Sequence, residues 1–392
     1  MSRFVVGAFG DAGHAFPAIA LARGLRGRGH EVVVETWEHW REAVETEGLG
    51  FAAAQEYKTF PPPPPGSGGP SPADAARALL PLLEDFGPDA VVSDILTAAP
   101  ALAAEMAGLP RVVLVPHVYP VHETGLPFFA LGARPARTRM GRAMWRAAEP
   151  VLAMGLRRGG RERNMTRAEL GLPPLDELHG GFSSDLALAA TFPQLEYPRT
   201  WPKHTHVIGP LEFEVPAPPV EIPEGDEPLA VIAPSTAQDP EGKLLRTALD
   251  ALADEPLRVL AATNRRGESL PRAPANAVVV DWMSYSQVMP LADLVITHGG
   301  HGTVCRALGA GAPTVCCPAV GDMAENGARV QWSGAGLMLP SRLVGPRSLR
   351  TVVRRVLADR SFGERARAIS AWAGQNHAAD RGAVLVERLI RT

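Results

Sequence analysis

The sequence predicts an α/β protein of two domains, each built on a parallel β-sheet with helices on both faces. Three observations lead to this class. A chain of 392 residues is long enough for two domains of ordinary size. Short apolar runs alternate with Ala-, Leu- and Arg-rich stretches of helical character, as in sheets that are buried on both faces. This alternation runs through the chain twice and is interrupted once.

The expected strands are continuous apolar runs, because a strand covered on both faces has no polar side to alternate with. In the first half they are Phe4–Phe9, Glu31–Glu35, Phe51–Ala54, Ala90–Ser93, Arg111–Val115, Leu186–Ala190 and His206–Ile208. In the second half they are Leu229–Ala233, Arg258–Ala262, Ala277–Val280, Leu294–Thr297, Pro313–Cys317 and Leu337–Leu339.

The interruption, residues 209–228, reads "GPLEFEVPAPPVEIPEGDEP" and is rich in Pro and Glu. This composition is typical of an interdomain linker. We therefore expect a first domain over residues 1–210, a linker over 211–228 and a second domain from residue 229 to about residue 370. Open parallel sheets bind ligands at the carboxyl ends of their strands, so two such domains predict a cleft with a ligand contributed from each side.

Three other segments are irregular or charged. The proline run "FPPPPPGSGGPSP" (60–72) predicts an extended loop, since it can join neither a helix nor a central strand. Residues 116–140 predict a long loop that opens into a helix, and long loops in compact domains are usually functional. The run "RRGGRER" (157–163) is typical of a solvated helix end.

Composition excludes several classes of function. The net charge of −3 indicates no partnership with nucleic acid or with an anionic membrane surface. The three cysteines, Cys305, Cys316 and Cys317, lie in apolar runs and predict buried thiols, not disulfides or a metal site. The apolar start is too short for a signal peptide, and no run is long enough to span a membrane. We expect a cytoplasmic protein.

Six residues from His298, "HGGHGT", hold three glycines and two histidines at a junction between a strand and a helix that begins at about Thr303. A helix N-terminus offers unpaired N–H groups and partial positive charge, and glycines let a phosphate approach the bare backbone. A diphosphate fits this arrangement, although a tight turn without a ligand has the same glycine content. The chain has no P-loop motif. "GAFGDAG" near the start, with Glu35 after the next strand, leaves NAD binding open.

The stretch "DWMSYSQVMPLADLVITHGGHGTVCRALGAGAPTVCCPAVGDMAENGARV" (281–330) resembles the donor-binding signature of family-1 glycosyltransferases of the GT-B fold. The similarity is greatest to the actinobacterial enzymes that glycosylate antibiotics and other natural products. It extends to "GDAGHAFPAIALARGLRGRGHEV" (10–32), "DAVVSDILTAAPALAAEMAGLP" (89–110) and "VIGPL" (207–211). The resemblance implies the GT-B fold, with a terminal helix (371–392) that returns to the first domain.

The resemblance also implies the residues that bind the nucleotide sugar. Trp282 and Met283 would border the base, and Ser235 and Thr236 would add hydroxyls from the loop after the first strand of the second domain. The diphosphate would be held by the His298 ring and by the backbone of Gly300, His301, Gly302 and Thr303. Asp322 would accept hydrogen bonds from sugar hydroxyls, with Asn326 nearby. No metal is expected, since the chain has no Asp-X-Asp triad.

One residue departs from the family pattern. Many relatives carry Asp-Gln where this chain has Asp322-Met323. A thioether is a weak acceptor, and a buried hydroxyl without a partner costs about 1–3 kcal/mol. Met323 therefore favours a sugar that lacks one hydroxyl, which suggests a TDP-linked deoxysugar as donor. The alternative is that Met323 only packs and that the donor is UDP-glucose.

His14 and Asp94 follow two predicted strands of the first domain at their carboxyl ends. The helix N-terminus at His14 should keep its ring neutral and able to accept a proton. A nearby Asp94 carboxylate would fix the tautomer and stabilise the cation. Without the resemblance, His14 could simply cap the first helix and Asp94 the next one. The family's use of a His/Asp pair at these positions implies that His14 deprotonates an acceptor hydroxyl in an inverting displacement.

The resemblance assigns the acceptor to the first domain, where aromatic and Met side chains near loops suit a flat apolar aglycone. The candidates are Trp37, Phe60, His117, Tyr119, Phe128, Phe129, Met144 and Trp145. We select Phe60, His117, Phe128 and Trp145.

Three other functions stay open on the sequence. A sugar-nucleotide epimerase of the same fold would share the diphosphate site without an acceptor pocket. A non-catalytic helper that binds nucleotide sugars would not need the His/Asp pair, and an NAD-dependent enzyme is the most distant alternative. The partners expected are small molecules, and a homodimer is not excluded.

Overall fold

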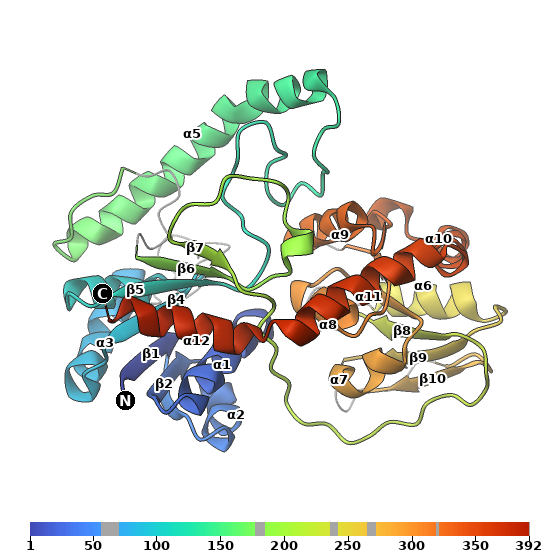
Figure 1. The fold of residues 1–392 in the computed structure, drawn as a ribbon, viewed down its shortest axis with the longest axis horizontal. Helices are drawn as coiled ribbons and strands as arrows, with labels where there is room; N and C mark the ends of the chain where they lie inside the picture. The colour runs from blue at the N-terminus through green and yellow to red at the C-terminus, as the bar shows by residue number, and fades with distance from the viewer. Residues whose placement is uncertain (56–69, 177–184, 236–241, 265–271, 319–320, 392) are drawn as a thin grey trace.

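The computed structural model describes residues 1–55, 70–176, 185–235, 242–264, 272–318 and 321–391, and it has two parallel sheets. The sheet of the first domain has the order β3-β2-β1-β4-β5-β6-β7 (Figure 1). Its strands are β1 Arg3–Gly7, β2 Glu31–Thr36, β3 Gly50–Ala53, β4 Ala90–Asp94, β5 Arg111–Val115, β6 Leu186–Ala189 and β7 Thr205–Val207.

The sheet of the second domain has the order β10-β9-β8-β11-β12-β13, again with every described pairing parallel. Its strands are β8 Leu229–Ala233, β9 Arg258–Ala262, β10 Ala277–Val280, β11 Leu294–Thr297, β12 Thr314–Cys316 and β13 Gly336–Met338. The predicted fold class is thus confirmed, and each expected strand is present within two residues of its expected ends.

Helices cover both faces of each sheet (Figure 1). Those of the first domain are α1 Ala12–Gly27, α2 Arg41–Thr46, α3 Pro72–Phe86, α4 Ala98–Met106 and α5 Arg139–Glu169. Those that follow are α6 Lys243–Leu252, α7 Tyr285–Val288, α8 His301–Gly309, α9 Asp322–Ser333, α10 Pro346–Ala358, α11 Arg360–Gln375 and α12 Ala378–Leu389. None of the helices in the described ranges has the length and apolar character needed to cross a bilayer.

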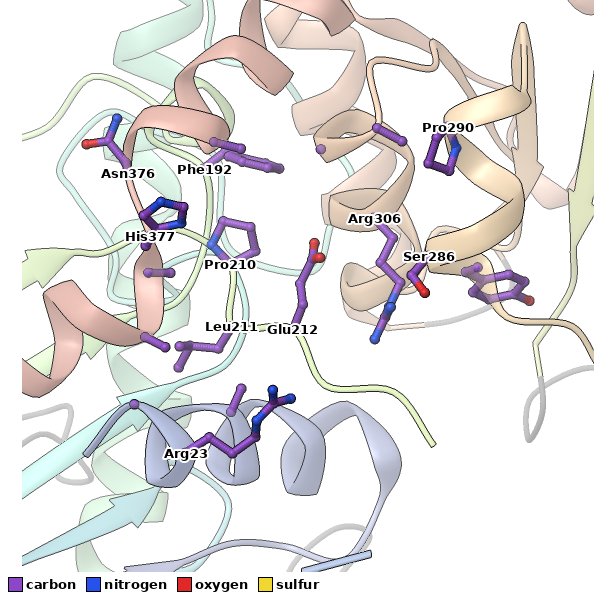
Figure 2. Close-up of a pocket in the computed structure, with 18 residues that line it drawn as sticks. Arg23, Phe192, Pro210, Leu211, Glu212, Ser286, Pro290, Arg306, Asn376 and His377 are labelled. Atoms are coloured by element: carbon purple, nitrogen blue, oxygen red, sulfur yellow. The ribbon is translucent and has the colours of Figure 1, made fainter. Parts of the chain in front are cut away.

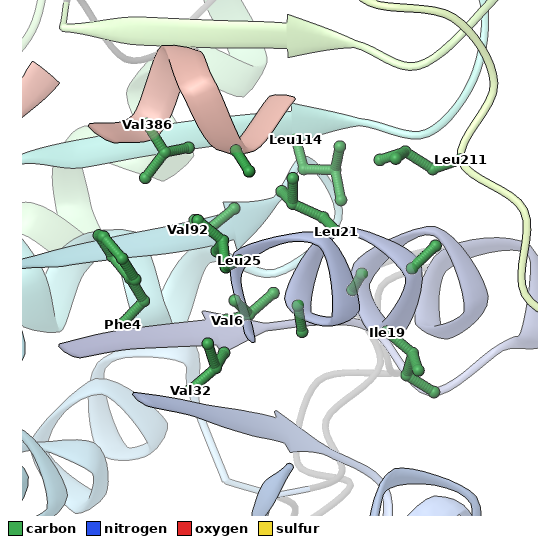
Figure 3. Close-up of a cluster of buried hydrophobic side chains, with 14 of the residues drawn as sticks. Phe4, Val6, Ile19, Leu21, Leu25, Val32, Val92, Leu114, Leu211 and Val386 are labelled. Carbon is green, nitrogen blue, oxygen red and sulfur yellow. The ribbon is translucent and has the colours of Figure 1, made fainter. Parts of the chain in front are cut away.

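The first core shows why the strands are continuous apolar runs. Phe4 and Val6 of β1 face α1, where they pack in one cluster with Leu21 and Leu25 (Figure 3). The intervening Val5 points to the opposite face and packs in a second cluster with residues of α3 and α4. Since side chains alternate between faces, both faces of β1 must be apolar.

The C-terminal helix α12 returns to the first domain and packs on α1 (Figure 1). The two helices approach closely at Gly24, where a Cβ would lie 2.8 Å from the Ala379 carbonyl oxygen. The end of α12 is held by Glu387, which accepts hydrogen bonds from Arg28 (2.5 Å) and His30 (2.9 Å). The expected crossing of the terminal helix is confirmed.

Helix α5 differs from the sequence expectation. The run "RRGGRER" lies inside this 31-residue helix, so its interpretation as a helix end is wrong. Two glycines cost about 1 kcal/mol each in a helix interior. The helix continues because its last turns are anchored: Arg167 pairs with Glu105 (2.6 and 2.8 Å), and Asn164 donates to the Leu175 carbonyl (3.0 Å).

Candidate functional site

His14 and Asp94 meet at the carboxyl edge of the first sheet. β1 and β4 are neighbouring parallel strands, so the loop after β1 and the last residue of β4 lie side by side. His14 is the third residue of α1, and its Nδ1 lies 2.9 Å from Oδ1 of Asp94. Asp94 is buried, and its Oδ2 accepts the Phe9 N–H (3.3 Å). Asp94 does not cap the next helix, because α4 begins after Thr97.

The Asp94 carboxylate also acts on the pKa of the His14 ring. Burial of the ring lowers its pKa, but the charge and hydrogen bond of Asp94, together with the charges of Asp11 and Asp322, raise the pKa of His14 above its usual value. A raised pKa makes the ring a stronger base, and the expectation of a ring held neutral by the helix N-terminus stays a prediction. A hydrogen bond from Nδ1–H to Asp94 leaves Nε2 as the atom that can take a proton.

Aromatic rings surround His14 on the first domain. His117 lies 6.3 Å from His14 between ring centroids, and Phe9 lies 6.0 Å away. Trp37 packs on Phe9 (5.0 Å), and Phe129 packs on His117 (5.7 Å). These rings form a wall beside the His14 ring. Phe9 was missed by the sequence analysis, although its position directly after β1 is the signal that could have identified it.

The predicted acceptor residues are dispersed. His117 is at the site, where burial lowers the pKa of its ring, and its Nδ1 lies 2.8 Å from the Val118 carbonyl oxygen. Phe128 and Trp145 pack on each other (5.7 Å), between the long loop and α5. Phe60 lies outside the described residues.

The glycine-histidine junction forms the turn between β11 and α8. Gly299 has φ +87°, a backbone conformation that favours glycine, and Gly300 lies so close to the His298 ring that a Cβ there would overlap Nε2. The Nδ1 of His298 lies 3.3 Å from the Ala233 carbonyl oxygen. The helix begins at His301, two residues before the expected start. At Gly302, an added Cβ would meet no atom of the described residues within 4 Å, so in this part of the chain the N-terminal turn is open to a ligand.

Helix α9 brings the Asp-Met pair to the same turn. Asp322 is its first residue, and the Met323 carbonyl oxygen would lie 2.8 Å from a Cβ at Gly299. Asn326 is buried, and its Nδ2 donates to the Gly299 carbonyl (3.0 Å). Asn326 therefore holds the glycine turn in place.

The His301 side chain points to the other domain. Its Nε2 lies 3.2 Å from the Ala190 carbonyl oxygen, directly after β6, and 3.4 Å from Sγ of Cys305. Burial lowers the pKa of His301 to about 4, so the ring is neutral at physiological pH. His301 can therefore offer its backbone to a ligand while its ring joins the two domains.

The two halves of the site face each other. A cavity of about 60 Å³ lies between the start of α1, which contributes Gly13 and Phe16, and the start of α8, which contributes His301 and Gly302. The Asp322 carboxylate of the second domain raises the pKa of His14 in the first, so the two side chains are close enough to interact through space. The start of α1, which carries His14, and the glycine turn at the start of α8 thus lie on opposite sides of one small cavity.

The residues expected around the nucleotide base have mixed outcomes. Ser235 is buried directly after β8, and Trp282 is half-buried. Met283 is only 2% exposed and packs in the core of the second domain, and the expectation that it borders the base stays a prediction. Thr236 lies outside the described residues. Within the described ranges, no group of three or more His, Cys, Asp or Glu side chains could hold a metal ion.

A larger cavity of about 590 Å³ opens at the hinge, away from the His14–Asp94 pair (Figure 2). Glu212 projects into it from the linker, between Arg306 of α8 and His377 at the start of α12 (Figure 2). The large and the small cavity are both lined by Pro210 to Glu212 and by Arg306. A continuous hinge region therefore leads from the large cavity to the small one.

A buried ion cluster fixes α9 to the first domain. Arg329 of α9 bonds Glu325 (2.8 Å) and, across the interface, Glu196 (2.9 Å), and its guanidinium lies 3.7 Å from the ring centroid of Tyr197. All four residues are buried. Because α9 starts with Asp322, this cluster sets the position of Asp322 relative to the first domain.

Comparisons with known proteins agree with the geometry. Residues 246–386 match the model of the erythromycin biosynthesis protein CIII-like C-terminal domain. The 4'-demethylrebeccamycin synthase of Lentzea aerocolonigenes is 30% identical over 92% of this chain and 93% of its own length. The O-mycaminosyltylonolide 6-deoxyallosyltransferase of Streptomyces fradiae is 28% identical over 98% of this chain and 96% of its own length.

Solved structures show the same fold. The glycosyltransferase of kitacinnamycin superposes with a TM-score of 0.78 at 21% identity, covering 99% of both chains. The glycosyltransferase VinC, solved in complex with dTDP, gives a TM-score of 0.72 at 20% identity over 100% of both chains. The chain therefore belongs to the GT-B glycosyltransferases of the natural-product and antibiotic biosynthesis type.

Proposed function

We propose that this glycosyltransferase moves a sugar from a TDP-sugar to a hydroxyl of an apolar natural-product acceptor, with inversion and with His14 as the general base. Residues 1–210 would bind the acceptor and residues 229–370 the nucleotide sugar. The observation that carries the proposal is the His14–Asp94 pair, 2.9 Å apart, at the start of α1, which lines the same small cavity as the first turn of α8.

The reaction is a single displacement. Nε2 of His14 takes the proton of the acceptor hydroxyl as its oxygen bonds to the anomeric carbon. The bond from that carbon to the diphosphate oxygen breaks, and its electron pair leaves with the nucleoside diphosphate. Asp94 stabilises the imidazolium that forms. General-base catalysis of this kind contributes about 10²–10⁴ in rate.

The leaving diphosphate is stabilised by the second domain. The first N–H groups of α8 have no acceptor within the helix, and the helix dipole adds partial positive charge. At Gly302 nothing obstructs the approach of a phosphate. The His298 ring and the Thr303 hydroxyl add donors, so this turn supplies charge stabilisation without a metal ion.

The sugar would be a deoxysugar. Asp322 starts α9 at the cleft and can accept two hydrogen bonds from sugar hydroxyls. Met323, beside it, cannot pair a further hydroxyl. The Streptomyces fradiae relative is named a 6-deoxyallosyltransferase, and VinC was solved with dTDP, which agrees with a TDP-linked deoxysugar. Clear preference for UDP-glucose over TDP-deoxysugars in a turnover comparison would remove the Met323 argument.

The acceptor would be flat and apolar around its reactive hydroxyl. Phe9, His117 and Phe129 line the first domain beside His14, and rings of this kind bind apolar aglycones. Two further relatives are named zeaxanthin glucosyltransferase, from Pantoea ananas and Pseudescherichia vulneris, and agree with an apolar acceptor.

The substitution His14→Ala tests the proposal. Transfer should be lost, while TDP affinity measured by calorimetry stays within about threefold, because the diphosphate is held by the other domain. His204→Ala, directly before β7 at the opposite edge of the same sheet, is the matched control and should keep full activity. Wild-type turnover in His14→Ala would refute the role of His14, and nucleotide release without an acceptor would favour an epimerase.

A further inference from the structure

Helix α5 carries a second apolar face that no described element covers. Met140, Met144, Val151, Met154 and Met165 are between 66% and 74% exposed. At about 100° per residue they fall within an arc of about 80° and follow about 37 Å of helix. Outside this stripe, the described residues contain only five other large hydrophobic side chains that are exposed.

The stripe is not needed to attach the helix. Trp145, Leu152 and Leu156 are half-buried and lie on the opposite side of α5, toward the body of the protein. In Figure 1, α5 forms one edge of the molecule, and no other element lies beyond it on that side. A flat surface could therefore contact the whole stripe at once.

The exposed charges of α5 are mostly basic. Six exposed residues are arginines and two are acids, Glu162 and Glu169, which lie within the arc of the stripe near its C-terminal end, where Glu162 pairs with Arg158 (3.4 Å). The arginines are Arg139, Arg142, Arg146, Arg157, Arg158 and Arg161. This local excess is hidden in the net charge of −3 for the whole chain, from which no membrane contact was expected.

We propose that α5 is an interfacial helix that docks the protein on an anionic lipid bilayer, with the methionine stripe in the headgroup region and the arginines on lipid phosphates. Basic amphipathic helices bind such surfaces by apolar burial and charge together.

Docking would bring the acceptor site near the membrane. The inner face of α5 contacts the loop after β5, where Trp145 packs on Phe128 and Glu149 accepts the Gly125 N–H (3.0 Å). That loop also carries His117, beside His14. An apolar acceptor dissolved in the bilayer would thus have a short path to the base.

The test is flotation of the full chain with lipid vesicles, which needs no activity measurement and is independent of the proposed reaction. The protein should bind vesicles of phosphatidylcholine containing phosphatidylglycerol, bind pure phosphatidylcholine at least tenfold more weakly, and be released by salt. Met140→Ser/Met144→Ser/Met154→Ser should weaken binding at least tenfold. Arg157→Gln/Arg161→Gln should weaken it about fivefold for each arginine.

Matched controls lie on the second domain. Leu291→Ser/Leu343→Ser removes exposed apolar side chains, and Arg342→Gln/Arg347→Gln removes exposed arginines, so both should bind as the wild type does. Equal binding to both vesicle types, no binding, or equal losses in the controls would overturn the proposal. A wild-type dimer that the methionine variant converts to monomer would show the stripe to be an interface between copies instead.

Discussion

The substitution Asp94→Asn tests the chemistry of the His14 base at its partner. The Asp94 side chain has no exposed surface and lies 2.9 Å from the ring, so an imidazolium formed in the reaction would be paired away from water. A charge-assisted hydrogen bond is worth about 1.5–3 kcal/mol, which corresponds to roughly 10- to 150-fold in rate. We expect kcat to fall by at least this factor, because the asparagine amide can also donate to Nδ1 and hold the ring in the wrong tautomer.

The pH dependence gives the second readout of the same variant. The pKa of His14 is raised by Asp94 against the effect of burial, so wild-type kcat/KM should fall as pH drops through a value above 6.5, where the ring binds a proton. In Asp94→Asn this acidic limb should move to lower pH. The assay is steady-state transfer from a TDP-sugar between about pH 5 and about pH 9.

Asp89→Asn is the control, because Asp89 precedes β4 at its other end and its side chain, among the described residues, accepts only the Arg3 N–H (2.8 Å). Its profile should match the wild type. An Asp94→Asn enzyme with kcat within about twofold of wild type and an unmoved acidic limb would refute the pairing argument.

Three further substitutions test the rest of the account. Gly302→Leu places a side chain in the open space at the start of α8, so the KM for the donor should rise at least tenfold. Tm should stay equal or increase, because leucine is the better helix former. An unchanged KM for the donor would contradict the diphosphate site. Glu387 has a pKa lowered to about 2 by Arg28 and His30, so the stability it provides is present above about pH 4.5 and is lost as pH falls toward 2. Glu387→Gln should lower the free energy of unfolding, measured in urea at neutral pH, by about 1–2 kcal/mol. It should also make stability fall less steeply with acid. An equally steep fall in the variant would assign the acid dependence to other groups. Arg329→Met leaves Glu196 and Glu325 buried without their cation, so it should lower the free energy of unfolding by about 3–5 kcal/mol. Adding Glu196→Gln and Glu325→Gln should largely restore this stability. A loss under about 1 kcal/mol would contradict the interdomain cluster.

The strands were predictable because burial on both faces leaves one signature, a continuous apolar run such as Arg111–Val115. Site residues at strand ends, His14 and Asp94, were predictable for a related reason, since parallel strands bring their carboxyl ends to one edge.

Contacts between distant segments that do not lie at neighbouring strand ends were not predictable. The Arg329–Glu196 pair joins residues 133 positions apart, and nothing in either local sequence indicates the partner. The length of α5 was missed because its anchors, such as Arg167 on Glu105, are also distant in sequence. The effect of Asp322 on the pKa of the His14 ring was missed for the same reason, because Asp322 reaches the ring through the fold.

The same limit applies to the surface of α5. A net charge for the whole chain averages the six exposed arginines of one helix with acids elsewhere, so it could not indicate a local basic face.

A crystal structure with TDP and an acceptor tests most directly whether the two half-sites form one reaction centre. The account predicts diphosphate oxygens within hydrogen-bond distance of the Gly302 and Thr303 N–H groups, and an acceptor hydroxyl within about 3 Å of Nε2 of His14. Diphosphate bound in the hinge cavity beside Arg306, or an acceptor hydroxyl remote from His14, would contradict it.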